Sequence, residues 1–374
     1  MDIGIIDADL LGRKHHNFPN LALMKISGYY KAFGHNVELI SYQDIGPNVL
    51  FRKNYDKIFI SKVFTDTFIP DGILNLPNIE YGGSGFMYSE NQKYPDFFLT
   101  PQLPDEIEHH FPDYHLYDEW VKNDLRFTKK NKSYYKNYTD YSIGFTTRGC
   151  FRKCSFCYNR NVKTVTKHSP LSEFLDVNRR KICLLDDNIF GYGKCLDIFT
   201  ELQQTGKPFY YNQGLDIRLL NEKKLDILSK SKYAADYTFA FDNYREKEII
   251  TEKIKLFKQF RPKTVPKFYI FCAYDENNVY DEEFWVKDIV EVFERLKILL
   301  KYGCIPYIMK FEKWRKSPYQ SLYSYISSWC APIIFKKQTF YEYHKDKKSL
   351  VRFVHKYPDI VEKYFNMRFK EINN

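Results

Sequence analysis

The sequence contains no run of about 18 apolar residues, so we expect no membrane-spanning helix. Its first residues, MDIGIIDADLLG, carry acidic side chains where a secretory signal peptide would carry Lys or Arg. There is also no internal repeat of about 20 to 50 residues and no low-complexity tract. These absences predict a cytoplasmic protein that is not attached to a membrane and whose thiols stay reduced.

The composition suits a large folded protein. The chain has 374 residues, 44% of them apolar and 18% aromatic, which is ample for one barrel-sized domain with an addition or for two domains. Eight cysteines in a reducing compartment indicate metal binding or core packing more than disulfides. The net charge of +10 is typical either of a nucleic-acid surface or of a general Lys bias, because the excess is spread along the chain.

The first 95 residues alternate between strand-like and helix-like segments, which predicts a Rossmann-like parallel sheet. A helix is expected at 20–36, where apolar residues recur at helical spacing and Gly34 marks the end. The segment 96–140 has little periodicity, and we expect a connector that packs on the surface. The expected strands of the first 95 residues are 2–7, 37–41, 55–64 and 78–85.

From residue 141 to about 315 the alternation restarts, and six strand-and-helix units follow one another. This pattern predicts a partial (β/α)6 barrel, in which ligands bind at the C-terminal ends of the strands. The remaining residues, 316–374, mix aromatic and basic side chains, and we expect them to cover one edge. The predicted fold class is therefore α/β, an N-terminal Rossmann-like parallel sheet plus a C-terminal partial (β/α)6 barrel.

Three cysteines lie close together directly after the first predicted barrel strand, in TTRGCFRKCSFCYN (146–159). A closed zinc site needs four ligands, whereas this loop offers Cys150, Cys154 and Cys157, and His168 or Cys183 would have to come from a distance. Three thiolates on one short loop suit a [4Fe–4S] cluster with one iron that the protein does not hold. That iron would be open to a substrate or cofactor.

The spacing Cys-x3-Cys-x2-Cys, with aromatic Phe156 before the third cysteine, resembles the signature of the radical S-adenosylmethionine (SAM) superfamily. The resemblance implies that Cys150, Cys154 and Cys157 bind a [4Fe–4S] cluster and that the open iron binds SAM. Reductive cleavage of SAM would then give methionine and a 5′-deoxyadenosyl radical, which removes a hydrogen atom from the substrate. It also implies that the backbone near Phe156 lies against the adenine.

The second barrel strand ends in LLDDNIFG (184–191). Many family members carry Gly-Gly-Glu here, whose backbone and carboxylate receive the SAM amino group. Asp-Asp-Asn resembles the branch of the superfamily with an N-terminal Rossmann-like, cobalamin-binding-like domain. Asp187 and Asn188 are therefore candidate SAM-binding residues, and the alternative for Asp187 is a helix cap.

The third and fourth barrel strands also end in polar residues. NQGLDIRLL (212–220) resembles the same branch and supplies the candidate SAM-binding residues Gln213, Asp216 and Arg218. Arg218 would pair with the SAM carboxylate through two hydrogen bonds, or else form a structural pair with Asp216. Asp242, at the end of the fourth strand, would bind a ribose hydroxyl or cap the next helix.

The N-terminal region raises the question of cobalamin. In the branch that it resembles, the common cobalamin signature is Asp-x-His-x-x-Gly, and the matching stretch here runs from Asp7 to Gly12. Asp9 stands where the histidine would bind cobalt, and His15 and His16 are out of register. The glycine-rich stretch YGGSGF (81–86) does resemble the strand end that approaches the corrin tail. Cobalamin is thus one alternative, and a domain kept for packing or substrate capture is the other.

Two functions from different classes follow. The first is a radical SAM enzyme that is oxygen-sensitive and needs an external one-electron reductant such as flavodoxin or ferredoxin, with a substrate that the sequence does not name. The second is a non-catalytic nucleic-acid-binding protein stabilised by zinc or an iron–sulfur cluster. Nucleic acid is a candidate partner under both.

Overall fold

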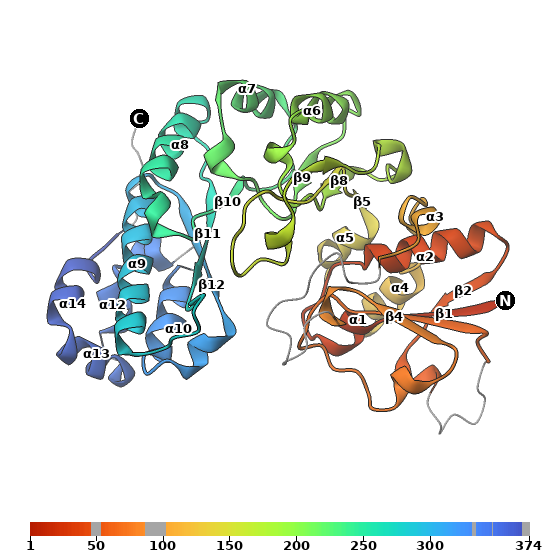
Figure 1. The fold of residues 1–374 in the computed structure, drawn as a ribbon, viewed down its shortest axis with the longest axis horizontal. Coiled ribbons are helices and arrows are strands. Elements are labelled where there is room, and N and C mark those ends of the chain that lie inside the picture. Colours follow the sequence, from red (N-terminus) through yellow and green to blue (C-terminus); the bar gives the residue numbers. More distant parts are fainter. Residues whose placement is uncertain (46–53, 87–101, 331–333, 346, 369–374) are drawn as a thin grey trace. The chain divides into compact units, whose positions relative to one another are not determined.

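The computed structural model describes residues 1–45, 54–86, 102–330, 334–345 and 347–368. These residues form a mixed α/β protein whose larger sheets are parallel, which confirms the predicted fold class (Figure 1). The chain divides into two compact units. The first contains residues 1–153, 158–186 and 207–209, and the second contains 154–157, 187–206 and the described part of 210–374.

The first unit begins with the predicted parallel sheet. Its strand order is β2-β1-β3-β4, and each pair of neighbours is parallel. The β-branched run of β1 explains its central place, because parallel strands are buried on both faces. The strands are β1 (Asp2–Asp7), β2 (Asn36–Leu39), β3 (Lys57–Ser61) and β4 (Ile79–Gly82).

The two faces of this sheet pack against different partners. Ile3 and Ile5 of β1 share one cluster of buried residues with the helix α2 and with residues 107–138. Ile6 of β1 belongs to a second cluster with Ile58 and Ile60 of β3. Because successive side chains of a strand point to opposite faces, one short apolar run fills two cores.

The segment expected to be a surface connector is instead part of the core. Where it is described, from residue 102 to 140, it carries helices, and Tyr114, Leu116, Tyr117, Tyr135 and Tyr138 are all at most 6% exposed. Its aromatic side chains pack on α2 and on the sheet. The helices of the first unit are α1 (Ala8–Gly12), α2 (Leu21–Ala32), α3 (Asp105–Glu108), α4 (Asp118–Phe127) and α5 (Lys136–Thr139).

The six strands predicted from residue 141 onward are all present. Two three-stranded sheets have the orders β5-β8-β9 and β10-β11-β12, and in the second unit Leu215 forms a parallel bridge with Phe239. A short antiparallel pair, β6 (Thr147–Arg148) and β7 (Thr166–Lys167), brackets the cysteine loop. The six strands are β5 (Tyr141–Gly144), β8 (Lys181–Leu184), β9 (Phe209–Tyr211), β10 (Thr238–Ala240), β11 (Lys267–Cys272) and β12 (Ile305–Lys310).

The second unit is covered by amphipathic helices. The longest described one, α9, begins at the N-cap Asp281, which accepts a hydrogen bond from the N–H of Phe284. It lies beside β11 and β12 (Figure 1), and one side of it carries the buried apolar residues. None of the described helices is long and apolar enough to cross a membrane. The helices are α6 (Cys195–Gln204), α7 (Glu222–Lys230), α8 (Lys247–Phe260), α9 (Glu282–Lys301), α10 (Gln320–Trp329), α11 (Ile334–Lys337), α12 (Phe340–His344), α13 (Val351–Lys356) and α14 (Pro358–Tyr364).

Candidate functional site

The cysteine loop follows β5 and is closed at its base by the β6–β7 pair, in which Thr147 lies opposite Lys167 and Arg148 opposite Thr166. Cys150, Cys154 and Cys157 are partly exposed, while the other five cysteines are buried. A tight turn runs from Cys154 to Cys157, whose N–H donates to the Cys154 carbonyl at 3.0 Å. The three thiols of the motif are therefore the accessible ones, and the five others behave as small core residues.

Glycine is required at the start of this loop. Gly149 has φ of +93°, and a Cβ there would lie 2.5 Å from the carbonyl oxygen of Thr164 on the returning part of the loop. Any other residue would meet both backbone strain and a steric overlap. Gly149 therefore sets the direction in which the chain enters Cys150.

A buried carboxylate anchors the residues just before the cysteines. Asp186, which follows β8 and is fully buried, accepts four hydrogen bonds from Thr146 and Thr147. The backbone N–H groups donate at 3.1 and 2.6 Å, and the hydroxyls donate at 2.6 and 2.7 Å. Burial raises the pKa of Asp186, although all four bonds favour the carboxylate. The end of β8 thus holds the base of the cysteine loop.

In the second unit, Phe156 of the cysteine loop joins an aromatic cluster. Its ring centroid lies 4.4 Å from that of Phe271 at the end of β11 and 5.6 Å from that of Tyr274. Phe311, directly after β12, completes the cluster at 5.1 Å from Tyr274. Phe156 remains 37% exposed, so the cluster offers an apolar ring surface of the kind against which a planar heterocycle can pack.

The strand-end residues Asn188, Asp216 and Arg218 lie together in the second unit. The Nδ2 of Asn188 donates to Asp216 at 3.3 Å, and Arg218 pairs with the same carboxylate at 2.7 Å. Glu246, which the sequence did not single out, accepts two further bonds from the Nη1 of Arg218, at 2.6 and 2.8 Å. The two carboxylates outweigh the effect of burial and raise the pKa of Arg218.

This network contains the ion pair between Asp216 and Arg218, which was one of the two alternatives for Arg218 that the sequence allowed. Arg218 uses its Nε and Nη2 on Asp216 and its Nη1 on both oxygens of Glu246, so all three of its nitrogens are engaged by these bonds. A bidentate bond to a ligand carboxylate would require Arg218 to release one of these acids. Its role toward SAM stays a prediction.

Asp242 lies where the ends of β10 and β11 meet. Its Oδ1 accepts a hydrogen bond from the N–H of Phe271 at 2.9 Å, and burial raises its pKa. Arg295 of α9, only 2% exposed, donates to the carbonyls of Phe241, Asp242 and Phe271 at 2.8 to 3.1 Å. Asn243, not Asp242, caps the next turn, so the capping alternative for Asp242 is wrong.

Two further predicted residues, Asp187 and Gln213, are less buried. Asp187 is partly exposed and Gln213 is exposed, which leaves both accessible to a ligand. Asn188 occupies the N-cap position of the short helix Ile189–Gly191, so Asp187 is not the cap residue. Asp186, Glu246 and Arg295 were not among the candidates selected from the sequence. Only Arg295 had a detectable signal, since it is a charged residue on the buried stripe of α9.

The structure does not supply a fourth ligand for a closed zinc site. Among the residues described, no three His, Cys, Asp or Glu side chains are gathered as a metal site, and this includes the three cysteines of the loop. Cys183 is fully buried within β8. His168 bonds to Ser169 at 3.0 Å and lies 3.4 Å from Glu108, and its pKa falls to about 4 mainly because of burial. The donor chemistry of the loop, three accessible thiols, still suits an iron–sulfur cluster.

The N-terminal unit does not fit cobalt ligation at the position expected from the sequence. Asp9 is 1% exposed and accepts hydrogen bonds from the N–H of Val63 at 2.6 Å and from the hydroxyl of Thr67. Its carboxylate therefore holds the loop after β3. Gly83 and Gly85 are needed for packing, because a Cβ at either would lie 2.4 or 2.6 Å from a carbonyl of that loop.

No protein-family model matches the chain, and no curated protein matches it. Among solved structures, the chain is similar to the cobalamin-dependent S-adenosylmethionine radical enzyme OxsB with aqua-cobalamin bound, at 14% identity and a TM-score of 0.34. It is also similar to the apo, selenomethionine-labelled form of OxsB, at 15% identity and a TM-score of 0.35. Each match covers 83% of this chain and 49% of the other, so the chain spans about half the length of these structures.

Proposed function

We propose that this protein is a radical SAM enzyme that cleaves S-adenosylmethionine reductively at a [4Fe–4S] cluster. The observation that carries the proposal is the cysteine loop itself. Its three thiols have the spacing Cys-x3-Cys-x2-Cys, follow a β-strand of a parallel pair, and are partly exposed while every other cysteine is buried. A structural site would need a fourth ligand, whereas three ligands leave one iron open for SAM.

Cys150, Cys154 and Cys157 would hold the cluster. The chemistry that such a cluster supplies when bound is a single electron for cleaving the sulfonium carbon–sulfur bond of SAM. The chain's own task is then to bind and orient SAM. We assign the adenine to the ring surface of Phe156, and the amino group to the carboxylate of Asp187.

The other assigned residues are a polar set from three strand ends. Asn188 and Gln213 are assigned to polar groups of SAM, and Asp242 is assigned to the ribose. We assign the SAM carboxylate to Arg218, which would have to exchange one of its two carboxylate partners for it. In the structure Asp216 and Glu246 hold Arg218, so they would keep the guanidinium oriented until SAM arrives.

The proposal includes an external one-electron reductant of the flavodoxin or ferredoxin class, sensitivity to oxygen and a cytoplasmic location. The substrate is not assigned, and nucleic acid stays a candidate. No step is assigned to cobalamin, because the residue that would replace the cobalt-binding histidine, Asp9, is already engaged by Val63 and Thr67.

The test is an anaerobic reconstitution of the full chain with iron and sulfide, followed by dithionite and SAM. We expect brown protein with about four irons per chain, and release of 5′-deoxyadenosine. Cys154→Ala should lose both. Cys304→Ala is the matched control, since Cys304 is fully buried outside the loop. Colourless protein that carries one zinc, or no 5′-deoxyadenosine with several reductants, would overturn the proposal and favour a metal-stabilised nucleic-acid-binding protein.

A further inference from the structure

The sheet β10-β11-β12 of the second unit has one face that is partly open to solvent. α9 lies beside β11 and β12 (Figure 1), and Phe268 and Ile270 of β11 are fully buried. Tyr269 and Phe271, which alternate with them, are partly exposed and lie on the opposite face, because successive side chains of a strand point to opposite sides. We call this opposite face the open face. The parallel register places its residues in three rows, which are Thr238, Lys267 and Ile305, then Ala240, Tyr269 and Tyr307, then Phe271 and Met309.

Aromatic rings run along the open face. Tyr307 is 51% exposed and Met309 is 43% exposed, although both are large side chains with much apolar surface. The ring centroid of Tyr307 lies 5.6 Å from that of Tyr269, in an edge-to-face contact. Phe271 lies in the next row and packs on Phe156, the residue that we assign to the adenine. An exposed apolar patch of this kind marks a binding surface, and this one leads along the strands to the ring of Phe156.

The charge of the open face and of the segment next to it is positive. None of the eight residues in the three rows is acidic, and the Nζ of Lys267 lies 4.8 Å from the ring centroid of Tyr307. The segment KFEKWRK (310–316), which begins at the last residue of β12, carries four basic residues and one acid. Its Arg315 and Lys316 are exposed. Cations beside exposed rings favour a ligand that is both anionic and aromatic.

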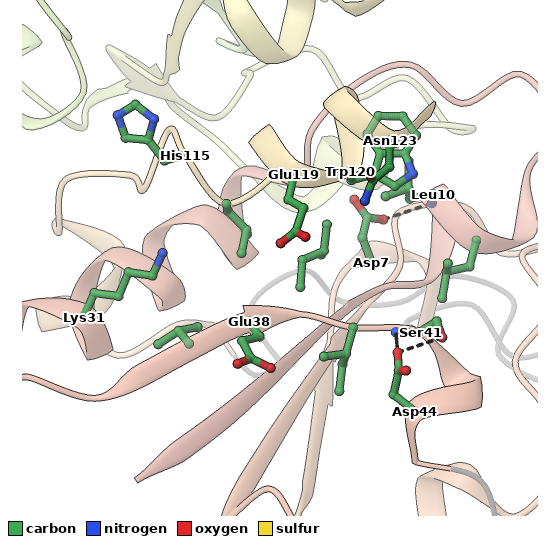
Figure 2. A pocket seen from close by; sticks show the side chains of 15 residues that line it. Asp7, Leu10, Lys31, Glu38, Ser41, Asp44, His115, Glu119, Trp120 and Asn123 are labelled. Carbon is green, nitrogen blue, oxygen red and sulfur yellow. Dashed lines mark hydrogen bonds between the residues drawn. The ribbon is translucent and has the colours of Figure 1, made fainter. Parts of the chain in front are cut away.

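A cavity of about 490 Å³ in the first unit has the opposite character (Figure 2). Its lining is mostly acidic, and two of its carboxylates are already engaged. Asp7 accepts the N–H of Leu10 at 3.1 Å, and Asp44 accepts the N–H of Ser41 at 2.6 Å. Such a lining disfavours phosphate, so an anionic ligand is expected at the open face and not in this cavity. The acids that line the cavity are Asp7, Glu38, Asp44 and Glu119.

We propose that the open face binds a single-stranded nucleic acid, which is the substrate of the proposed radical chemistry. Its bases would stack on the rings of Tyr269 and Tyr307, and its phosphates would contact Lys267, Arg315 and Lys316. Proteins that bind single strands combine stacking rings with positive charge in this way. A duplex fits less well, because its bases are already stacked on one another. The substrate role rests on the proposed function, whereas the binding itself requires neither iron nor SAM.

The binding test is fluorescence anisotropy of the full chain, without iron and under reducing conditions, with labelled RNA and DNA strands of about 12 nucleotides. The same sequence as a duplex and a polyglutamate competitor are the comparison probes. We expect saturable binding of the single strands, weaker binding of the duplex and little competition by polyglutamate. The logarithm of the affinity should fall with the logarithm of the salt concentration with a slope of about −2, as expected for three phosphate contacts. Lys316→Gln should make this slope shallower by about 0.7.

The variants test the stacking. Tyr307→Ala should weaken binding by about 5- to 150-fold, as expected for the loss of one stacked base, whereas Tyr307→Phe keeps the ring and should bind like the wild type. Tyr307 is half exposed on an edge strand, so neither change is expected to unfold the protein. Phe127→Ala is the matched control, because Phe127 is an 81% exposed ring on α4 of the first unit and should not affect binding.

Absence of saturable binding would overturn this inference. So would equal competition by polyglutamate, which would indicate a surface for any acidic polymer, including acidic peptides, or a Tyr307→Ala affinity equal to that of the wild type. The substrate role has a separate readout. A single strand added to the reconstituted protein should speed the release of 5′-deoxyadenosine, and an unchanged rate would refute that role.

The outcomes also separate this inference from the proposed function. SAM cleavage by a chain that binds no single strand would overturn the inference alone. Binding of a single strand by a chain that does not cleave SAM would overturn the proposed function and, with it, the substrate role.

Discussion

The four hydrogen bonds between Asp186 and the base of the cysteine loop lead to a prediction about the free energy of unfolding. Asp186→Asn keeps the size of the side chain but replaces one carboxylate oxygen by an NH2 group. In the structure Oδ1 accepts three hydrogen bonds and Oδ2 accepts one, from the N–H of Thr146. An asparagine can keep its oxygen at the Oδ1 position, but its NH2 group then faces the N–H of Thr146.

The magnitude follows from these four bonds. A hydrogen bond to a charged group contributes about 1.5–3 kcal/mol and a neutral one about 0.5–1.5, so the change costs roughly 1 kcal/mol for each bond. The buried N–H of Thr146, left facing another donor, adds about 1–3 kcal/mol. Removing a buried charge returns a few kcal/mol, which is consistent with the raised pKa of Asp186. We expect a net loss of about 2–4 kcal/mol.

The assay is urea unfolding of the full chain, together with hydrogen exchange at the amides of Thr146 and Thr147. Asp236→Asn is the matched control, because Asp236 is exposed and should change stability by less than about 0.5 kcal/mol. Asp186→Asn should lower the unfolding free energy and speed exchange at both threonines. Stability within about 0.5 kcal/mol of the wild type, with unchanged exchange, would refute the anchoring role.

Three further predictions follow from single sites. Gly149→Ala should destabilise the protein by about 2 kcal/mol or more in urea unfolding, because φ is +93° there, whereas Gly193→Ala, where a Cβ meets open space, should be neutral or slightly stabilising. Burial lowers the pKa of His344 from 6.5 to about 4, so the folded protein binds fewer protons than the unfolded chain in that window. Stability should thus fall as the pH drops from about 6.5 to about 4, by up to about 3 kcal/mol from this group, and His344→Gln should flatten the profile of unfolding free energy against pH. Arg295→Met should lower the melting temperature by several degrees, because it leaves the carbonyls of Phe241 and Phe271 without their buried donor.

Local patterns predicted most of the regular elements. The apolar run of β1 and the helical spacing over 20–36 depend only on neighbouring residues, and the structure has β1 at Asp2–Asp7 and α2 at Leu21–Ala32. Gly34 adopts φ of +77° just after α2, as expected for a residue that ends a helix. Asn221, a residue type that favours the N-cap position, precedes α7 and accepts a hydrogen bond from the N–H of Lys224 at 3.0 Å.

The segment 102–140 shows where local patterns are not sufficient. Its helices are short, and five of its aromatic residues are tyrosines set among Asp, Glu and Lys, so the positions that belong to the core are hard to recognise from the sequence. Most of those rings are nevertheless buried, and the hydroxyls of Tyr114 and Tyr117 bond to residues far away in the sequence. Tyr114, for example, donates to the carbonyl of Phe174 at 2.6 Å and accepts the N–H of Ile143 at 2.8 Å. Such distant partners are not visible in the segment itself.

Hydrogen-bond partners that are distant in the sequence also limit what the sequence predicts about the candidate site. The ends of successive parallel strands meet at one edge, so the sequence could select Asn188, Asp216 and Arg218 as candidates from the strand ends. It could not say which of them already have partners. Asp186 and Asp187 are adjacent and chemically identical. Asp186 is nevertheless fully buried and hydrogen-bonded to two threonines, whereas Asp187 is partly exposed. That difference arises because the loop after β5 brings four donor groups of two threonines to the Asp186 carboxylate, whereas the side chain of Asp187 stays partly exposed.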